Sequence, residues 1–91
     1  MADPMSGPDD AAIEATILRL ATERGAAASI CPSEVARDLR GEDWRPLMTP
    51  VRRAAVRMAK RGEIEVLRKG KPVADLDELR GVIRLRIVAS A

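Results

Sequence analysis

The chain has 91 residues, of which 46% are hydrophobic, 33% charged and 1% aromatic, with a formal net charge of +2. This length leaves room for one small hydrophobic core. The single cysteine, Cys31, and the absence of His exclude an internal disulfide and an ordinary Cys/His zinc site, and favour a reducing, cytoplasmic environment. We expect no signal peptide and no membrane association, because no apolar run approaches the length of a membrane span.

Charge is distributed unevenly along the chain. Residues 1–44 hold nine acidic and four basic residues, a net charge of −5, whereas residues 45–91 hold twelve basic and five acidic residues, a net charge of +7. This asymmetry favours a polyanionic partner, although a biased genome composition would also produce an excess of Arg.

The first elements follow from composition and spacing. Residues 1–8 are small, polar and rich in Pro and Gly, which predicts a disordered tail before a single domain over residues 9–91. Asp9 or Asp10 can cap a helix that ends at Gly25. Its apolar positions have helical spacing and are Ile13, Ile17, Leu20 and Ala21.

A strand of two or three residues at 29–31 is expected to lead directly into a second helix. Pro32 suits the first helical position, and the Glu34 carboxylate can reach back to the amide of Cys31. We therefore interpret Cys31 as a half-buried capping residue, with a redox-sensing thiol as the alternative. This helix is expected to end at residues 40–41.

The third helix is predicted after a further turn at residues 44–48, where Trp44 is interpreted as a core anchor. Thr49 and Pro50 repeat the pattern of a cap followed by Pro, and the helix is expected to run to Arg61 with Gly62 as its stop. The amides after Thr49 would then provide an anion site.

Beyond Gly62 the apolar period changes from 3.6 to 2, which predicts a hairpin of strands at 64–66 and 83–87. Antiparallel pairing would place charged side chains on one face as cross-strand ion pairs. They are Glu63, Glu65, Arg84 and Arg86. The connection from Leu67 to Gly81 is basic at first and then acidic, and its acidic residues are interpreted as capping a short turn.

The order of these elements predicts an α+β winged-helix fold, a helix-turn-helix variant in which three helices pack on a small antiparallel β-hairpin sheet. The third helix would be the recognition helix and the long connection the wing. At 100° per residue the third helix has one apolar face and one basic arc, with no acidic residue inside the helix to neutralise the arc. The arc consists of Arg52, Arg53, Arg57, Lys60 and Arg61, and the wing adds Arg68, Lys69 and Lys71.

Such an arc favours contacts to the phosphates of double-stranded DNA over a merely solvated face. Because the chain has no Asn or Gln, we expect weakly selective, phosphate-dominated binding, as in a small bacterial transcriptional regulator. The alternative is a protein-interaction adaptor of the same fold that docks on another protein or forms a homodimer. Because the chain has no His, neither Cys31 nor any of its Ser residues has a His base that could activate it as a nucleophile. The sequence therefore predicts that the protein is not an enzyme and has no cofactor or metal site.

Three segments carry a resemblance to a known family: CPSEVARDL, DWRPLMTPVRRAAVRMAKRGEIEVLRKGKPV and RGVIRLRI. Together they resemble an uncharacterised bacterial family of small winged-helix-like proteins, one of the domains of unknown function. The resemblance covers residues 13–87, and the combination of WRPLM, VRRAA and a GKPV turn is unusual. It implies a winged-helix fold and brings no established activity with it.

Overall fold

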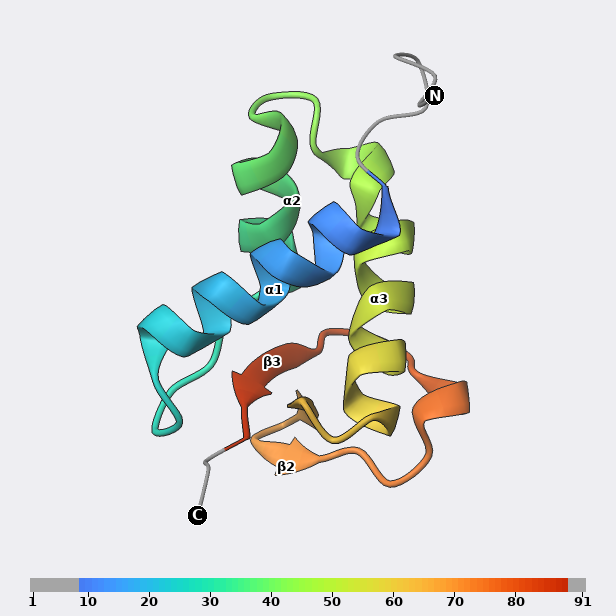
Figure 1. Ribbon diagram of the computed structural model, residues 1–91. Helices are drawn as coiled ribbons and strands as arrows, with labels where there is room; N and C mark the ends of the chain where they lie inside the picture. The colour runs from blue at the N-terminus through green and yellow to red at the C-terminus, as the bar shows by residue number, and fades with distance from the viewer. Residues whose placement is uncertain (1–8, 89–91) are drawn as a thin grey trace.

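The computed structural model describes residues 9–88, so the predicted disordered tail at 1–8 lies outside the described residues (Figure 1). The fold is α+β, with three helices and a small antiparallel sheet, as predicted. The sheet has three strands, because part of the predicted connection forms the strand β2 beside the expected pair. The elements are α1 (Asp10–Arg24), α2 (Pro32–Arg40), the 3-10 turn η1 (Arg45–Leu47), α3 (Met48–Lys60), β1 (Ile64–Arg68), β2 (Lys71–Pro72), the 3-10 turn η2 (Leu76–Glu78) and β3 (Arg84–Ile87).

Helix α1 confirms its predicted caps. The Asp9 carboxylate accepts a hydrogen bond from the amide of Ala12 at 2.8 Å. At the other end Gly25 has a φ of 87°, a left-handed value that a residue with a side chain rarely adopts. Ile13 and Ile17 are fully buried, so the helix turns its predicted apolar face to the core.

Helix α2 confirms the role of Cys31 as its N-cap residue. The amide of Cys31 donates to the Glu34 carboxylate at 2.7 Å, and Pro32 is the first helical residue. Glu34 also accepts a hydrogen bond from Arg24 at 2.6 Å. Partial burial raises the pKa of Glu34, but the Cys31 amide and Arg24 outweigh it, so the pKa of this carboxyl lies below its ordinary value.

Helix α3 begins differently from the prediction. It starts at Met48, directly after η1, so Thr49 and Pro50 are its second and third residues. Pro is tolerated there because the amides of the first turn have no partner within the helix. The predicted cap at Thr49 is therefore wrong. The anion site expected at the amides after Thr49 loses the helix start on which it rested.

The sheet has the order β2-β1-β3, and the predicted pairing of its two longer strands is confirmed. The expected strand at 29–31 is reduced to one bridge, in which Ile30 and Leu85 exchange two hydrogen bonds of 2.8 Å. This bridge places the segment between α1 and α2 along the free edge of β3.

Of the two expected cross-strand ion pairs, one forms. Glu65 lies opposite Arg86, and their side chains approach to 2.8 Å. The register places Arg84 opposite Leu67, so Arg84 does not reach Glu63. Arg84 instead donates to Ser29, through Nε to Oγ at 2.7 Å and through Nη2 to the backbone oxygen at 2.8 Å.

The connection expected as one long loop contains a tight hairpin. Arg68 pairs with Lys71, and the two residues between them, Lys69 and Gly70, have φ values of 53° and 80°. Two consecutive positive φ values are the signature of a type I′ turn, whose twist matches that of the paired strands. Further along, the Asp75 carboxylate accepts from the amide of Asp77 at 3.1 Å and caps η2, as the acidic segment predicted.

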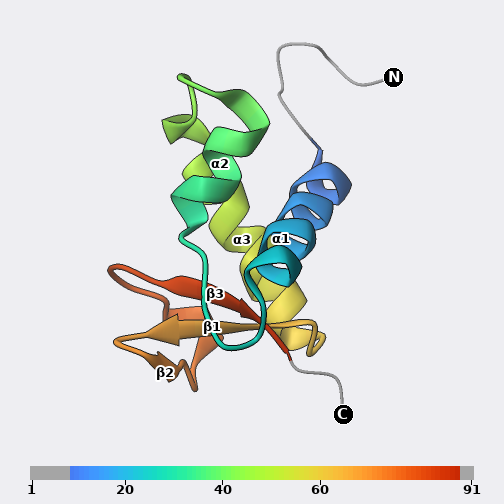
Figure 2. The same ribbon diagram turned by 90° about the vertical axis from the view of Figure 1, so that its left-hand side faces the viewer.

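The core lies between the helices and one face of the sheet. Helix α3 is central to it, because it packs against α1, α2, β1 and η2. Trp44 lies half-buried at the edge of this core, with the guanidinium groups of Arg37 and Arg45 at 4.6 and 5.0 Å from its ring centroid. Figure 2 shows α1 on one side of the molecule and the β1–β2 hairpin pointing to the other.

Candidate nucleic-acid interface

Helix α3 has the two faces that its sequence predicts. Its apolar side chains are buried among the other helices and the sheet, and its basic side chains point away from the core. The buried residues are Val51, Ala54, Ala55 and Met58. The small size of the two alanines allows the neighbouring helices to approach α3 closely.

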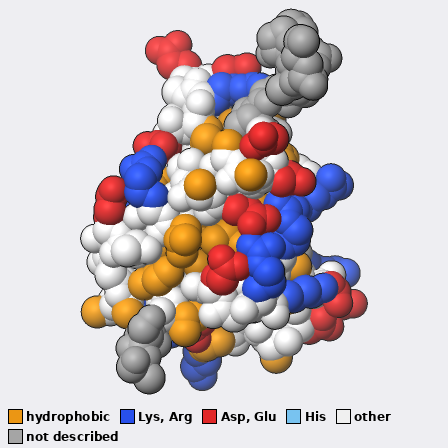
Figure 3. All heavy atoms as spheres, viewed as in Figure 1, with side chains coloured by type: hydrophobic (Ala, Val, Ile, Leu, Met, Phe, Trp, Pro, Cys, Tyr) orange, Lys and Arg blue, Asp and Glu red, His pale blue; other side chains and the backbone are white. Residues whose placement is uncertain are grey.

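Three of the five predicted arc residues form ion pairs with other elements. The Arg57 Nε atom donates to Glu14 at 2.9 Å, and Arg61 binds the other oxygen of the same carboxylate as well as Glu63. Lys60 reaches Asp77 of η2 at 2.7 Å. Figure 3 shows acidic side chains beside the basic ones on the face that carries α1. The arc is therefore neutralised in part by carboxylates that lie far away in the sequence.

Glu14 links α1 to the carboxyl-terminal half of α3. Hydrogen bonds from Arg61 and Arg57 favour its charged form and hold the pKa of this carboxyl below its ordinary value of 4.5. The Nη2 atom of Arg57 is buried without a hydrogen-bond partner and lies 3.6 Å from Asp10, which keeps Arg57 directed toward α1. Arg57 and Arg61 thus have a structural role in holding two helices together.

The Glu14 contacts predict a pH-dependent contribution to stability. Because the folded pKa is below that of the unfolded chain, this contribution is complete above pH 4.5 and is lost as the pH falls through the folded pKa. We expect Glu14→Gln to lower the melting temperature by a few degrees at pH 7. The difference in melting temperature between this variant and wild type should shrink progressively as the pH falls below 4.5. Thermal melts followed by circular dichroism at each pH measure it, and a constant difference would contradict the assignment.

The amino-terminal half of α3 carries the two arc residues for which the described part of the chain offers no carboxylate partner. Arg52 donates to the backbone oxygen of Gly81 at 3.1 Å, which leaves its charge unneutralised and attaches the segment before β3 to the helix. Arg53 is exposed and forms no ion pair within residues 9–88.

The three predicted wing cations lie together on the β1–β2 hairpin. Arg68, Lys69 and Lys71 are exposed, and none of them has a salt-bridge partner in the described part of the chain. The type I′ turn places all three around one tip, on the side of the molecule away from α1 (Figure 2). The hairpin, whose strand β1 packs against α3, therefore carries three cations without a salt-bridge partner among the described residues.

Two residues on the side of the molecule that carries the hairpin, Val82 and Arg84, were not identified from the sequence as candidate site residues. Val82 is 80% exposed, and its position follows from the alternation that turns Ile83 and Leu85 inward. Arg84 was assigned to a cross-strand ion pair, whereas it donates to Ser29 and forms no salt bridge within residues 9–88. Its charge lies close enough to Glu34 to help lower the pKa of that carboxyl.

Within residues 9–88 no group of three or more His, Cys, Asp or Glu side chains is arranged to hold a metal ion.

The Cys31 Sγ atom accepts a hydrogen bond from Ser33 at 3.1 Å and lies half-buried at the start of α2. Over residues 9–88, no helix is both long and apolar enough to span a membrane.

The fold and its charged surface define a small α+β protein with three helices, a three-stranded antiparallel sheet and a basic hairpin. The chain belongs to the family described as "Protein of unknown function (DUF3253)", which matches residues 10–88 and so covers nearly the whole described structure. The predicted membership of an uncharacterised domain family is confirmed. A comparison with curated proteins finds no match.

Proposed function

We propose that this chain is a winged-helix protein that binds the phosphate backbone of double-stranded DNA. The order of its elements supports a winged-helix assignment. Helix α1 is followed by a one-residue strand, then by α2 and α3, and finally by the strands β1 and β3 with the wing between them. The observation that carries the proposal is the unneutralised basic hairpin beside α3. A small transcriptional regulator is the role that such a protein fits.

The proposed contacts come from two elements. Arg52 and Arg53 on α3 and the three hairpin cations supply positive charge without competing carboxylates among the described residues. Cations so placed can bind phosphates and release the counterions condensed on the duplex. Lys60 contributes only if its exposed pair with Asp77 opens, at a small cost, since exposed ion pairs are weak.

Sequence selectivity is expected to be low. Asn and Gln, which read adenine through two hydrogen bonds, do not occur in the chain. Direct base contacts would rely on Arg with guanine, or on the half-buried Val56 with a thymine methyl group.

The salt dependence of affinity tests this proposal. About five phosphate contacts predict that log K against log salt concentration falls with a slope of roughly −4 to −5. Fluorescence anisotropy with a generic labelled duplex, at several salt concentrations, measures that slope. A slope near zero, or no binding at low salt, would refute DNA binding by this surface.

A further inference from the structure

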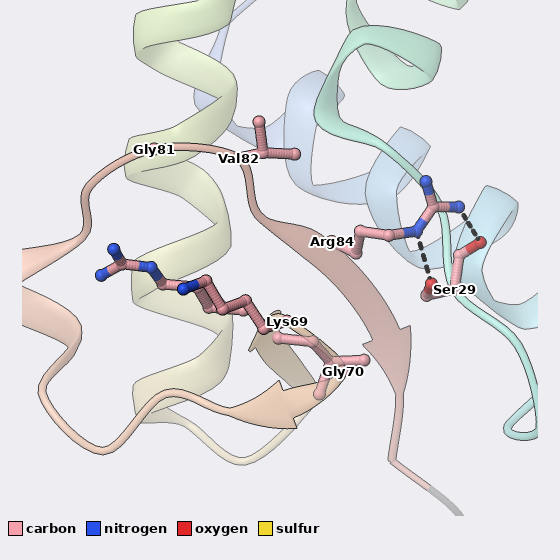
Figure 4. Close-up of a pocket in the computed structure, with 8 residues that line it drawn as sticks. Ser29, Lys69, Gly70, Gly81, Val82 and Arg84 are labelled. Carbon is pink, nitrogen blue, oxygen red and sulfur yellow. Dashed lines mark hydrogen bonds between the residues drawn. The ribbon is translucent and has the colours of Figure 1, made fainter.

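Two cavities meet on the side of the molecule that carries the hairpin. The larger, of about 480 Å³, lies between the β1–β2 turn and the start of β3. Figure 4 shows Val82 and the Lys69–Gly70 turn on opposite sides of it. The smaller, of about 270 Å³, is bordered by Trp44 and Arg52. Gly81 and Val82 line both cavities, which therefore adjoin at Val82, and the two cavities together are called the groove below.

The groove has an apolar surface at its centre. Leu67 lies at the larger cavity, Trp44 and Met48 border the smaller one, and Val82 between them is 80% exposed. A single exposed apolar residue is common on a protein surface, but one that joins two apolar cavities indicates a binding site.

The charged residues that line the groove, among those the structure describes, are all basic. Arg68, Lys69 and Arg84 line the larger cavity and Arg52 the smaller, and no acidic residue of the range 9–88 lines either. Two of these cations are held in place, because Arg84 donates twice to Ser29 and Arg52 donates to the Gly81 oxygen. Their fixed positions reduce the entropy that a bound carboxylate would cost.

We propose that this groove binds an extended acidic segment of a partner protein, with an aliphatic side chain seated against Val82 and carboxylates facing Arg52, Lys69 and Arg84. Charge complementarity selects an acidic partner, and the concave apolar cavities select one with aliphatic side chains. Arg52 and Lys69 also belong to the proposed phosphate contacts, so an acidic segment and a duplex would compete for these two cations. A duplex does not enter cavities of this size, so the apolar contact at Val82 belongs to the peptide alone. Peptide binding here does not depend on the proposed DNA binding.

A labelled peptide of alternating Glu and Leu tests the site directly by fluorescence anisotropy with the full chain. Two matched peptides separate the contributions, one with every Leu replaced by Ser and one with every Glu replaced by Gln. We expect each control peptide to bind at least about tenfold more weakly. The Ser peptide loses aliphatic burial, of which one side chain accounts for roughly that factor, and the Gln peptide loses its charge attraction to the cations of the groove. Equal binding of the Glu/Leu and Glu/Ser peptides would overturn the proposal.

The variant Val82→Ser removes the apolar contact without changing charge, and its exposure makes it harmless to folding. We expect it to weaken the Glu/Leu peptide about tenfold while duplex affinity stays at the wild-type value. Leu18→Ser, at an exposed position on α1, is the matched control and should leave both affinities unchanged. If Val82→Ser weakens duplex binding as much as peptide binding, the groove is part of a nucleic-acid surface and the peptide assignment is wrong.

Discussion

Replacing Lys69 and Lys71 by Gln is expected to weaken duplex DNA binding on the order of 50-fold at about 0.1 M salt. Both side chains lie at the hairpin tip without a salt-bridge partner in the described residues. Each phosphate contact contributes about 0.9 to the salt slope, so the double variant should also reduce the slope by roughly 2. The change in slope matters most, because it counts lost phosphate contacts.

A control with the same loss of net charge is available on the helices. Arg19→Gln with Arg40→Gln removes an exposed and a half-buried cation, which form surface ion pairs with Asp38 and Asp43. Such pairs contribute little to stability, so the control should fold normally and lose less than about threefold in affinity. Anisotropy titrations of both variants and wild type over the same salt series make the comparison. Equal losses in the two variants would show that net charge alone matters, and would remove the hairpin from the interface.

Local signals in the sequence predict the helices well because the residues that determine a helix end lie within a few positions of each other. The contact between Cys31 and Glu34 spans three residues, and the contact between Asp9 and Ala12 spans three as well. Both are visible in the sequence as spacing. The hairpin pairing follows similarly from alternation, since a register error would turn Leu85 away from the core.

The spacing of residues in the sequence could not predict that the basic arc is neutralised in part. Helical spacing identifies counter-charges on the same helix, but the carboxylate that binds Arg57 and Arg61 belongs to Glu14, and the one that binds Lys60 belongs to Asp77 of the wing connection. Only the packing of α1 and η2 on α3 brings them together. Charge reversal at Arg57 would consequently disturb folding as well as binding, whereas reversal at Arg53 addresses binding alone.

The sequence analysis did not predict the tight turn between β1 and β2, because its residues are not the usual ones for this turn type. A type I′ turn requires positive φ at both central residues, and Asn-Gly or Asp-Gly is its usual sequence. Here Lys69 stands at the first position, with a φ of 53°. The sequence therefore predicts one long connection that is basic at its start, whereas the structure places the Lys69–Gly70 turn between β1 and β2.

The largest effect on stability is expected from Leu85→Ala. Leu85 is fully buried at the middle of β3, opposite Val66 in β1, and it bridges to Ile30 on the other side. It therefore joins the sheet to the segment between α1 and α2. Truncating a buried Leu to Ala loses its apolar burial and leaves a cavity, at a cost of about 2–5 kcal/mol. That cost is a large share of the ~5–15 kcal/mol that stabilises a typical domain.

Urea denaturation followed by circular dichroism measures this loss as a lower transition midpoint at an unchanged dependence on urea concentration. The matched control is Leu18→Ala on α1, where the side chain is 39% exposed. Because Leu18 is partly exposed and does not belong to the buried core, we expect a cost of about 1 kcal/mol, well below that of Leu85→Ala. A Leu85→Ala variant as stable as the Leu18→Ala variant would contradict the position of β3 in the core. The hairpin tip extends from β1, which is the strand that pairs with β3. The destabilised Leu85→Ala variant should therefore also lose DNA affinity in proportion to its unfolded fraction. Addition of duplex should raise its transition midpoint.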